Sequence, residues 1–309
     1  MTISVIITNK LPKFVRLHPF GVQPYKFGST CAIAMTNSDN PIYVPSKTIR
    51  PRKQFGQHWL RSDDVLNKIL RAGQLQPSDR ILEIGPGTGN LTRLLLPFVE
   101  SLTAVEIDRD LCEKLRKTMH QKNFQLIEGS ILDIPLPAQT NKVIANIPYN
   151  ITGEILKRLL GNLSEPIQQF EQIVLLVQKE IGDRLAAKAG HKAYNGLSVK
   201  IQYLAECQFI CDVPATAFYP PPKVNSAVVR IIPRPPVTAA SDPKFLDRLL
   251  TLGFATKRKM LRNNLISEID RDQLVLILES MGINGQVRAE DLDVAQWVAL
   301  SEAIIKSKL

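Results

Sequence analysis

The sequence predicts an α/β fold: a doubly wound, largely parallel sheet followed by a small helical domain at the carboxyl end. Three observations predict it. Short apolar segments alternate with helical patterns between residues 63 and 178, a glycine-rich turn follows the first buried strand, and from residue 242 the pattern is helical only. Strands that alternate with helices are joined by right-handed crossovers, which makes the sheet parallel.

The elements are expected in the following order. A helix begins at Asp63/Asp64 and ends at Gly73, since Val65, Leu66, Ile69 and Leu70 have helical spacing. A short, buried-type strand is expected within 80–85, and further strands within 101–108, 141–149 and 172–178. Residues 124–134 are expected to form a strand followed by a loop, and helices are expected within 85–98, 109–120 and 151–160. Strand-like segments flank a proline-rich loop within 208–232, and we expect them to form a closing hairpin. Helical segments are expected within 243–265, 270–283 and 293–309.

The chain divides into three predicted regions. Residues 1–45 are apolar and basic with no acid before Asp39, and we expect a disordered extension or an artefact of the start site, with Met35 as the alternative start. A targeting segment is the alternative. The sheet domain spans 46–236, because the sequence PRPP at 233–236 marks a boundary, and the helical domain spans 237–309.

Composition and charge limit the classes of binding partner and the cellular compartment that are expected for this chain. The net charge is +10, and residues 1–60 hold eight Lys/Arg against one acid, which favours a polyanionic partner. No apolar run approaches the roughly 18 to 20 residues of a membrane span, so no membrane is expected. The four cysteines form no C-x-x-C pair, so neither disulfides nor a metal site is expected. The cytoplasm is the predicted compartment, with a plastid as the alternative if residues 1–45 are a transit peptide.

A cofactor site is predicted at the sequence LEIGPGTG, 82–89, where Gly85 and Gly87 lie in the turn between a strand and a helix. Asn90 stands where a dinucleotide-binding turn has its third glycine, and Glu83 precedes the turn. This spacing favours S-adenosylmethionine over NAD. Glu106, at the end of the next strand, can accept hydrogen bonds from ribose hydroxyls. After the third strand, either Ser130 or Asp133 can accept one from the adenine amino group.

A methyl-acceptor site is predicted at Asn146-Ile147-Pro148-Tyr149, which follows the fourth strand. The Asn146 side-chain carbonyl and the Ile147 backbone carbonyl can both accept from an exocyclic amine, while Tyr149 stacks on its ring. An aromatic amine is a poor nucleophile because its lone pair is delocalised, and two acceptors localise that lone pair toward the methyl group. Catalysis then consists of positioning and electrostatics. Phe218 is a second stacking candidate.

These residues together resemble the small-subunit rRNA adenine dimethyltransferases (the KsgA/RsmA family). The resemblance rests on RKQFGQHWL, ILEIGPGTGNLT, AVEID, NIPYNIT, FYPPPKVNSAVVR and KRKMLRNNL, in the family's order. It implies a Rossmann-like class I methyltransferase sheet and dimethylation of the 6-amino groups of two adjacent adenosines near the 3′ end of small-subunit rRNA, in ribosome biogenesis. Each target adenosine receives two methyl groups from S-adenosylmethionine.

The resemblance also implies residue roles. It places S-adenosylmethionine contacts at His58, Leu60, Gly85, Glu106 and Asn146, and base stacking at Tyr149 and Phe218. His58 departs from the asparagine that the family often has, and Ser130 stands where the family tends to have an acid.

The expected partner is small-subunit rRNA or a pre-30S particle, bound by a monomer. Phosphate contacts are expected from basic residues at two places, namely Arg50, Arg52 and Lys53, and Lys257, Arg258, Lys259 and Arg262. Three alternatives stay open. They are a large-subunit rRNA adenine methyltransferase of the antibiotic-resistance type, a DNA adenine methyltransferase, and a ribosome-assembly factor without essential catalysis.

Overall fold

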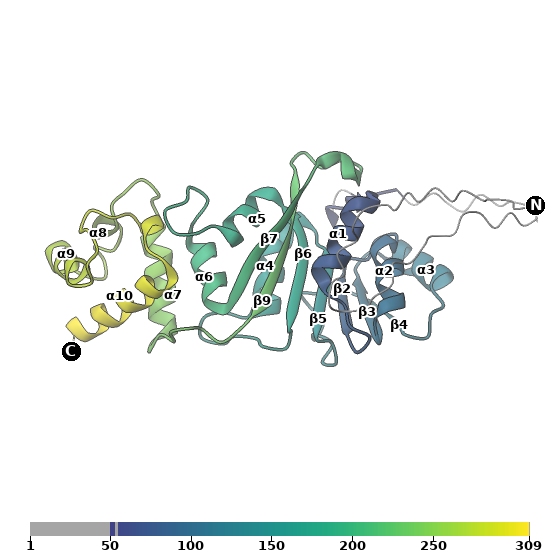
Figure 1. Ribbon diagram of the computed structural model, residues 1–309, viewed down its shortest axis with the longest axis horizontal. Coiled ribbons are helices and arrows are strands. Elements are labelled where there is room, and N and C mark those ends of the chain that lie inside the picture. The colour runs from purple at the N-terminus through teal and green to yellow at the C-terminus, as the bar shows by residue number, and fades with distance from the viewer. Residues whose placement is uncertain (1–49, 53–54, 309) are drawn as a thin grey trace, which may run out of the picture. The chain divides into compact units, whose positions relative to one another are not determined.

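The computed structural model describes residues 50–52 and 55–308, which belong to one compact unit, Thr48–Leu309 (Figure 1). The predicted extension, 1–45, and Lys53 lie outside the described residues. The helical-domain boundary at residue 237 stays a prediction, because the unit continues through it.

A seven-stranded sheet forms the centre of the unit, in the order β4-β3-β2-β5-β6-β9-β7. Neighbouring strands from β4 to β6 are parallel, whereas β9 is antiparallel to both β6 and β7. The predicted parallel sheet and closing hairpin are therefore confirmed. The strands are β2 (Arg80–Ile84), β3 (Ser101–Glu106), β4 (Phe124–Glu128), β5 (Lys142–Asn146), β6 (Gln172–Gln178), β7 (Ala205–Val213) and β9 (Ser226–Pro233).

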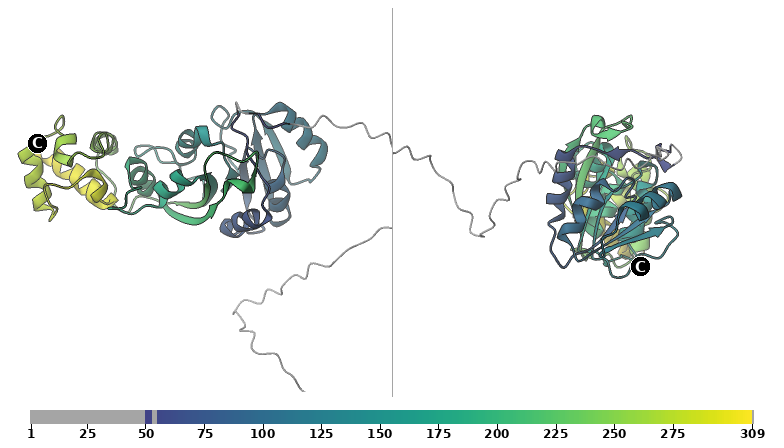
Figure 2. Two further views of the ribbon diagram at one scale, coloured as in Figure 1. Left: turned by 90° about the horizontal axis from the view of Figure 1, so that it is seen from above. Right: turned by 90° about the vertical axis from the view of Figure 1, so that its right-hand side faces the viewer.

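Helices cover both faces of the sheet, and alternate residues of a strand point to opposite faces (Figures 1 and 2). Ile144 packs in the cluster with α1, α2 and α3, whereas its neighbour Val143 packs in the cluster with α4, α5 and α6. The helices are α1 (Asp63–Gly73), α2 (Asn90–Leu95), α3 (Arg109–Thr118), α4 (Thr152–Leu160), α5 (Lys179–Ala186) and α6 (Gly196–Leu204).

The carboxyl-terminal part is helical, as predicted, and lies beyond α6 in Figure 1. Its core is continuous with one face of the sheet, and Trp297 is fully buried in it. The predicted helical segment 243–265 is interrupted, because residues 254–260 form turns. The helices are α7 (Pro243–Gly253), α8 (Leu261–Asn264), α9 (Arg271–Ser280) and α10 (Val294–Ser307). Among the described residues no helix is long and apolar enough to cross a membrane.

The structure contains several elements that the sequence patterns do not predict. Helices α5 and α6 were not expected, and neither was the two-stranded sheet of β1 (Trp59–Leu60) and β8 (Phe218–Tyr219). Residues 124–134 form a strand followed by a loop, as predicted, and the strand ends at Glu128. Strand β5 ends at Asn146 and is followed by the 3-10 turn η3 (Tyr149–Ile151); the other 3-10 turns are η2 (Leu96–Phe98), η4 (Ala215–Ala217) and η5 (Ala289–Asp291).

Candidate active site

A pocket opens where the strand order reverses, between β2 and β5. The carboxyl ends of parallel strands meet at this edge, and ligands bind there in open α/β sheets. The pocket has an empty volume of ≈ 970 Å³, including space open to solvent. Its lining includes most of the predicted residues, namely His58, Leu60, Gly85, Gly87, Glu106, Ser130, Asn146, Ile147 and Tyr149.

The glycine turn leaves room for a ligand. Gly85 and Gly87 have φ of 66° and 59°, a backbone region that favours glycine. A Cβ added at Gly85 would meet only the Asn146 backbone oxygen, at 3.9 Å, so it would occupy the pocket itself. At Gly87 a Cβ would approach the Trp59 ring to 3.1 Å. The turn therefore leaves space for a ligand at Gly85 and accommodates a tryptophan ring at Gly87.

Glu106 is buried at the end of β3, with 5% of its surface exposed. One carboxylate oxygen accepts from the Gly87 N–H at 3.1 Å and the other from the Asp108 N–H at 2.9 Å. Burial raises the pKa of Glu106, while these two N–H donors oppose the rise. Each oxygen keeps lone-pair capacity for a further donor. The carboxylate thus ties the glycine turn to β3 and can also bind ligand hydroxyls.

Of the two candidates after β4, the structure brings Ser130 to the pocket and leaves Asp133 away from it. Ser130 lines the pocket, and its hydroxyl accepts from the Leu132 N–H at 3.2 Å. Asp133 is exposed and is not among the lining residues. Ser130 is accordingly the better placed of the two for a contact with an adenine.

The Asn146 amide is held in one orientation. Its Nδ2 donates to the His58 backbone oxygen at 3.0 Å. Because a carbonyl oxygen only accepts, the amide nitrogen must face His58, and the Asn146 Oδ1 is left as an acceptor. Ile147 is 1% exposed, so its side chain anchors the backbone that follows. A site that binds an amine through its N–H groups needs such a fixed acceptor oxygen.

Tyr149 and His58 form a stacked pair, with ring centroids 5.9 Å apart and an interplanar angle of 20°. The Tyr149 hydroxyl is hydrogen-bonded to the Ser226 hydroxyl. Burial raises the pKa of Tyr149 to about 12, so this phenol stays neutral. His58 Nδ1 lies 2.7 Å from the Pro220 backbone oxygen and therefore carries the proton, which leaves Nε2 as the acceptor in the neutral ring.

Phe218 does not line the pocket. It lies in β8, is 4% exposed, and packs in the core cluster that contains Leu60 and Val213. Its stacking on a base stays a prediction.

Sequence reasoning missed a buried acid beside the site. Asp108 is fully buried, caps α3 through the Asp110 N–H, and accepts from Gln57 Nε2 at 2.8 Å. Arg52 forms ion pairs with Asp108, at 3.2 Å, and with Asp110. These contacts hold the segment before His58 against α3. The signal that could have found Asp108 is an aspartate directly before a helix.

Glu83, which precedes the glycine turn, lies near Thr92, a residue that sequence reasoning did not single out. Both are buried, and neither Glu83 Oε2 nor the Thr92 hydroxyl has a partner within hydrogen-bond geometry. Burial raises the pKa of Glu83 to about 8; the nearby Thr92 hydroxyl opposes the rise, and the negative charge of Glu106 adds to it. Glu83 is therefore largely protonated at neutral pH in the free protein.

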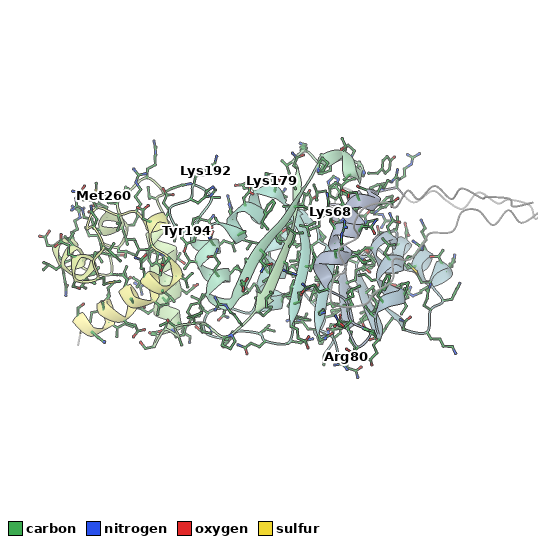
Figure 3. All side chains as sticks on the ribbon, viewed as in Figure 1. Lys68, Arg80, Lys179, Lys192, Tyr194 and Met260 are labelled. Carbon is green, nitrogen blue, oxygen red and sulfur yellow. The ribbon has the colours of Figure 1, made fainter. Side chains whose placement is uncertain are left out.

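The carboxyl-terminal basic residues are exposed, as expected, except that Arg262 is half-buried. Lys257, Arg258 and Lys259 lie in the turns between α7 and α8 rather than on a helix. Lys257 Nζ donates to the Lys192 backbone oxygen at 2.7 Å, which joins these turns to the loop between α5 and α6 (Lys192 is labelled in Figure 3). Of the amino-terminal basic residues predicted to contact phosphates, Arg50 is exposed, whereas Arg52 forms ion pairs with Asp108 and Asp110.

The pocket fits S-adenosylmethionine. Its glycine turn leaves open space, and the Glu106 carboxylate can take ribose hydroxyls. Ser130 can receive an adenine, and the acceptor carbonyls of Asn146 and Ile147 stand at the same edge. In the part of the chain described, no three or more His, Cys, Asp or Glu side chains gather as a metal site would require.

Comparisons with known proteins agree with this geometry. A family model described as ribosomal RNA adenine dimethylase matches residues 49–306. A protein of a Nostoc species named ribosomal RNA small subunit methyltransferase A is 56% identical over 267 residues, covering 83% of this chain and 98% of that protein. The protein of the same name from Crocosphaera subtropica is 56% identical over 263 residues, covering 82% and 97%.

Solved structures share the fold. The crystal structure of a dimethyladenosine transferase from Plasmodium falciparum has a TM-score of 0.68 and 27% identity, covering 82% of this chain and 99% of that one. The 23S rRNA methyltransferase ErmE has a TM-score of 0.65 and 25% identity, covering 80% and 99%. The predicted class I methyltransferase sheet is thereby confirmed.

Proposed function

The chain belongs to the ribosomal RNA adenine dimethylase family, and on that premise we propose that it dimethylates two adjacent adenosines near the 3′ end of small-subunit rRNA. The family predicted from the motifs is confirmed, together with the enzyme class and S-adenosylmethionine as methyl donor. The observation that carries the proposal is the fixed Asn146 amide, which presents an acceptor oxygen at the edge where the donor pocket lies.

The acceptor residues work by positioning and electrostatics. The Asn146 Oδ1 and the Ile147 backbone oxygen accept from the 6-amino group of the target adenine, and so localise the nitrogen lone pair. The amine loses its proton as positive charge develops, so no strong base is required. Tyr149, fixed by His58 and Ser226, supplies the stacking face. After the first transfer the same two acceptors orient the monomethylated amine for the second.

The donor pocket uses different residues. When bound, S-adenosylmethionine supplies the methyl group from a sulfonium. Glu106 would hold the ribose, Ser130 the adenine, and the glycine turn with His58 and Leu60 the methionine end. We assign no contact to Asp133, since it is exposed away from the pocket. Burial raises the pKa of Glu106. Hydrogen bonds from the ribose hydroxyls would oppose this rise, because they favour the ionised carboxylate.

The substrate is a folded RNA, whose phosphates Arg50, Lys257, Arg258 and Lys259 would contact. We propose a pre-30S particle as the physiological form of the substrate, a monomer as the active form, and the cytoplasm as the compartment. A plastid stays the alternative compartment. Residues 1–48 lie outside the family match.

Large-subunit rRNA is the second candidate substrate, since the fold of ErmE is close to this one. Small-subunit rRNA is favoured by relatives that are 56% identical over most of their length. An assembly role without catalysis is disfavoured, because Gly85, Glu106 and Asn146 stand together in one pocket.

The test is methyl transfer to separate substrates. The protein is incubated with labelled S-adenosylmethionine and, in parallel, undermethylated small subunits, large subunits or DNA. We expect label in small-subunit rRNA only. Label confined to large-subunit rRNA or to DNA would overturn the proposal, and absence of label from every substrate would favour a non-catalytic assembly role.

A further inference from the structure

An exposed aromatic ring stands beside the pocket, and none of the roles above uses it. Tyr219 is 48% exposed, whereas Phe218 before it is 4% exposed. In the β1/β8 pair, Leu60 is opposite Phe218 and Trp59 is opposite Tyr219. Residues directly opposite in an antiparallel pair share a face, so Trp59 and Tyr219 lie on one face while Leu60 and Phe218 lie on the buried one.

The face that carries Tyr219 is continuous with the pocket. Trp59 lines the pocket, and its ring approaches Gly87 closely. The next residue after Tyr219, Pro220, accepts from the ring of His58, which in turn stacks on Tyr149. Tyr219 is thus connected to the donor pocket through Trp59 and to the acceptor residues through Pro220 and His58, but it does not line the pocket itself.

Arg61 covers the Tyr219 ring. Its guanidinium carbon lies 4.1 Å from the ring centroid, and its backbone N–H donates to the Ala217 oxygen at 2.8 Å. Arg61 is exposed, and no ion pair within residues 50–52 and 55–308 involves it. An arginine and a tyrosine held together present flat π surfaces and an unneutralised positive charge.

We propose that Arg61 and Tyr219 form a stacking site for a nucleobase that flanks the target adenosine. Unpaired RNA bases stack on aromatic rings and guanidinium planes, and such stacking tolerates any base. With the target base against Tyr149 and its neighbour against the Arg61–Tyr219 pair, the RNA strand would be held on both sides of the pocket mouth. The inference rests on the proposed function and identifies how that site grips its substrate.

The test is binding of undermethylated small subunits, measured without and with S-adenosylmethionine. Stacking of one base corresponds to a factor on the order of tenfold or more in affinity, so Tyr219→Ala should weaken binding to that extent. Tyr219→Phe keeps the ring and should bind like the wild type. Arg61→Lys keeps the charge but loses the plane, and should weaken binding by several-fold.

Phe98→Ala is the matched control. Phe98 is 52% exposed and precedes β3, so it lies at the amino edge of the sheet, opposite the site. Its replacement should leave binding unchanged. Affinity for S-adenosylmethionine and the unfolding temperature of each variant show whether a loss is structural.

Wild-type binding by Tyr219→Ala would overturn the inference, as would an equal loss in Tyr219→Phe, or a parallel loss of affinity for S-adenosylmethionine. The readout does not depend on methyl transfer. Failure of the wild type to methylate small subunits would contradict the proposed function, while the binding comparison would still decide this inference.

Discussion

Glu106→Gln replaces one carboxylate oxygen by an amide nitrogen and keeps the size of the side chain. The two Glu106 oxygens accept from the N–H groups of Gly87 and Asp108. Glutamine has one accepting oxygen, so its NH2 group must face one of those donors. One buried N–H is then left unpaired, which costs about 1–3 kcal/mol of folding stability.

A second effect is expected on binding of the methyl donor. A hydrogen bond to a charged group contributes about 1.5–3 kcal/mol. Loss of one ribose contact should therefore weaken S-adenosylmethionine binding by about 10- to 150-fold. Isothermal titration calorimetry of the wild type and the variant measures this. Glu128→Gln is the matched control, because Glu128 is directly opposite Glu106 in the β3/β4 register but is exposed and paired with Arg116 at 2.9 Å.

The control variant should bind S-adenosylmethionine within about twofold of the wild type, since its acid lies outside the pocket. A folded Glu106→Gln protein with wild-type affinity would refute the assignment of the ribose to Glu106. An equal loss in Glu128→Gln would refute it too, because the effect would then be one of general charge at this edge.

Three further predictions concern other parts of the molecule. The pKa of Glu83 is raised to about 8 in the folded chain, against 4.5 for a glutamate exposed to water. Folding therefore takes up a proton between these pH values, and the free energy of unfolding declines as pH rises from about 4.5 to about 8. Glu83→Gln should remove that decline, and urea unfolding should show a larger relative gain at pH 8 than at pH 5; equal effects at both would contradict it. Asn146→Ala should abolish methyl transfer while calorimetry shows a smaller loss of S-adenosylmethionine affinity, and wild-type turnover would disprove the role. Replacing Lys257, Arg258 and Lys259 by Glu should weaken RNA binding and flatten its dependence on salt in filter binding; an unchanged slope would mean that these residues form only a solvated surface.

The sheet could be predicted because buried parallel strands are short apolar runs that alternate with helices. The position of the site followed from this, since Gly85, Glu106 and Asn146 each stand at the end of a strand, and those ends meet at one edge. The predicted residues that follow strands directly were therefore brought together in one pocket.

The rest depended on contacts between distant residues, which strand and helix patterns do not encode. Asp108 is buried by Gln57 and Arg52, more than 50 positions earlier. Arg52 is predicted as a phosphate contact from its basic stretch alone, and the sequence pattern does not show its ion pairs with Asp108 and Asp110. Likewise, Phe218 and Tyr219 are adjacent aromatic residues, and only the register of β8 on β1 shows which of them is buried.

The most direct test of the proposed function is the number and position of methyl groups added to undermethylated small subunits. After exhaustive reaction, small-subunit rRNA is digested and its modified nucleosides are mapped by mass spectrometry. The proposed function predicts four methyl groups per particle, as two adjacent adenosines that each carry two on the 6-amino nitrogen, and none with Asn146→Ala. Methylation at a single adenosine, at another atom of the base, or unaffected by loss of the Asn146 amide would contradict it.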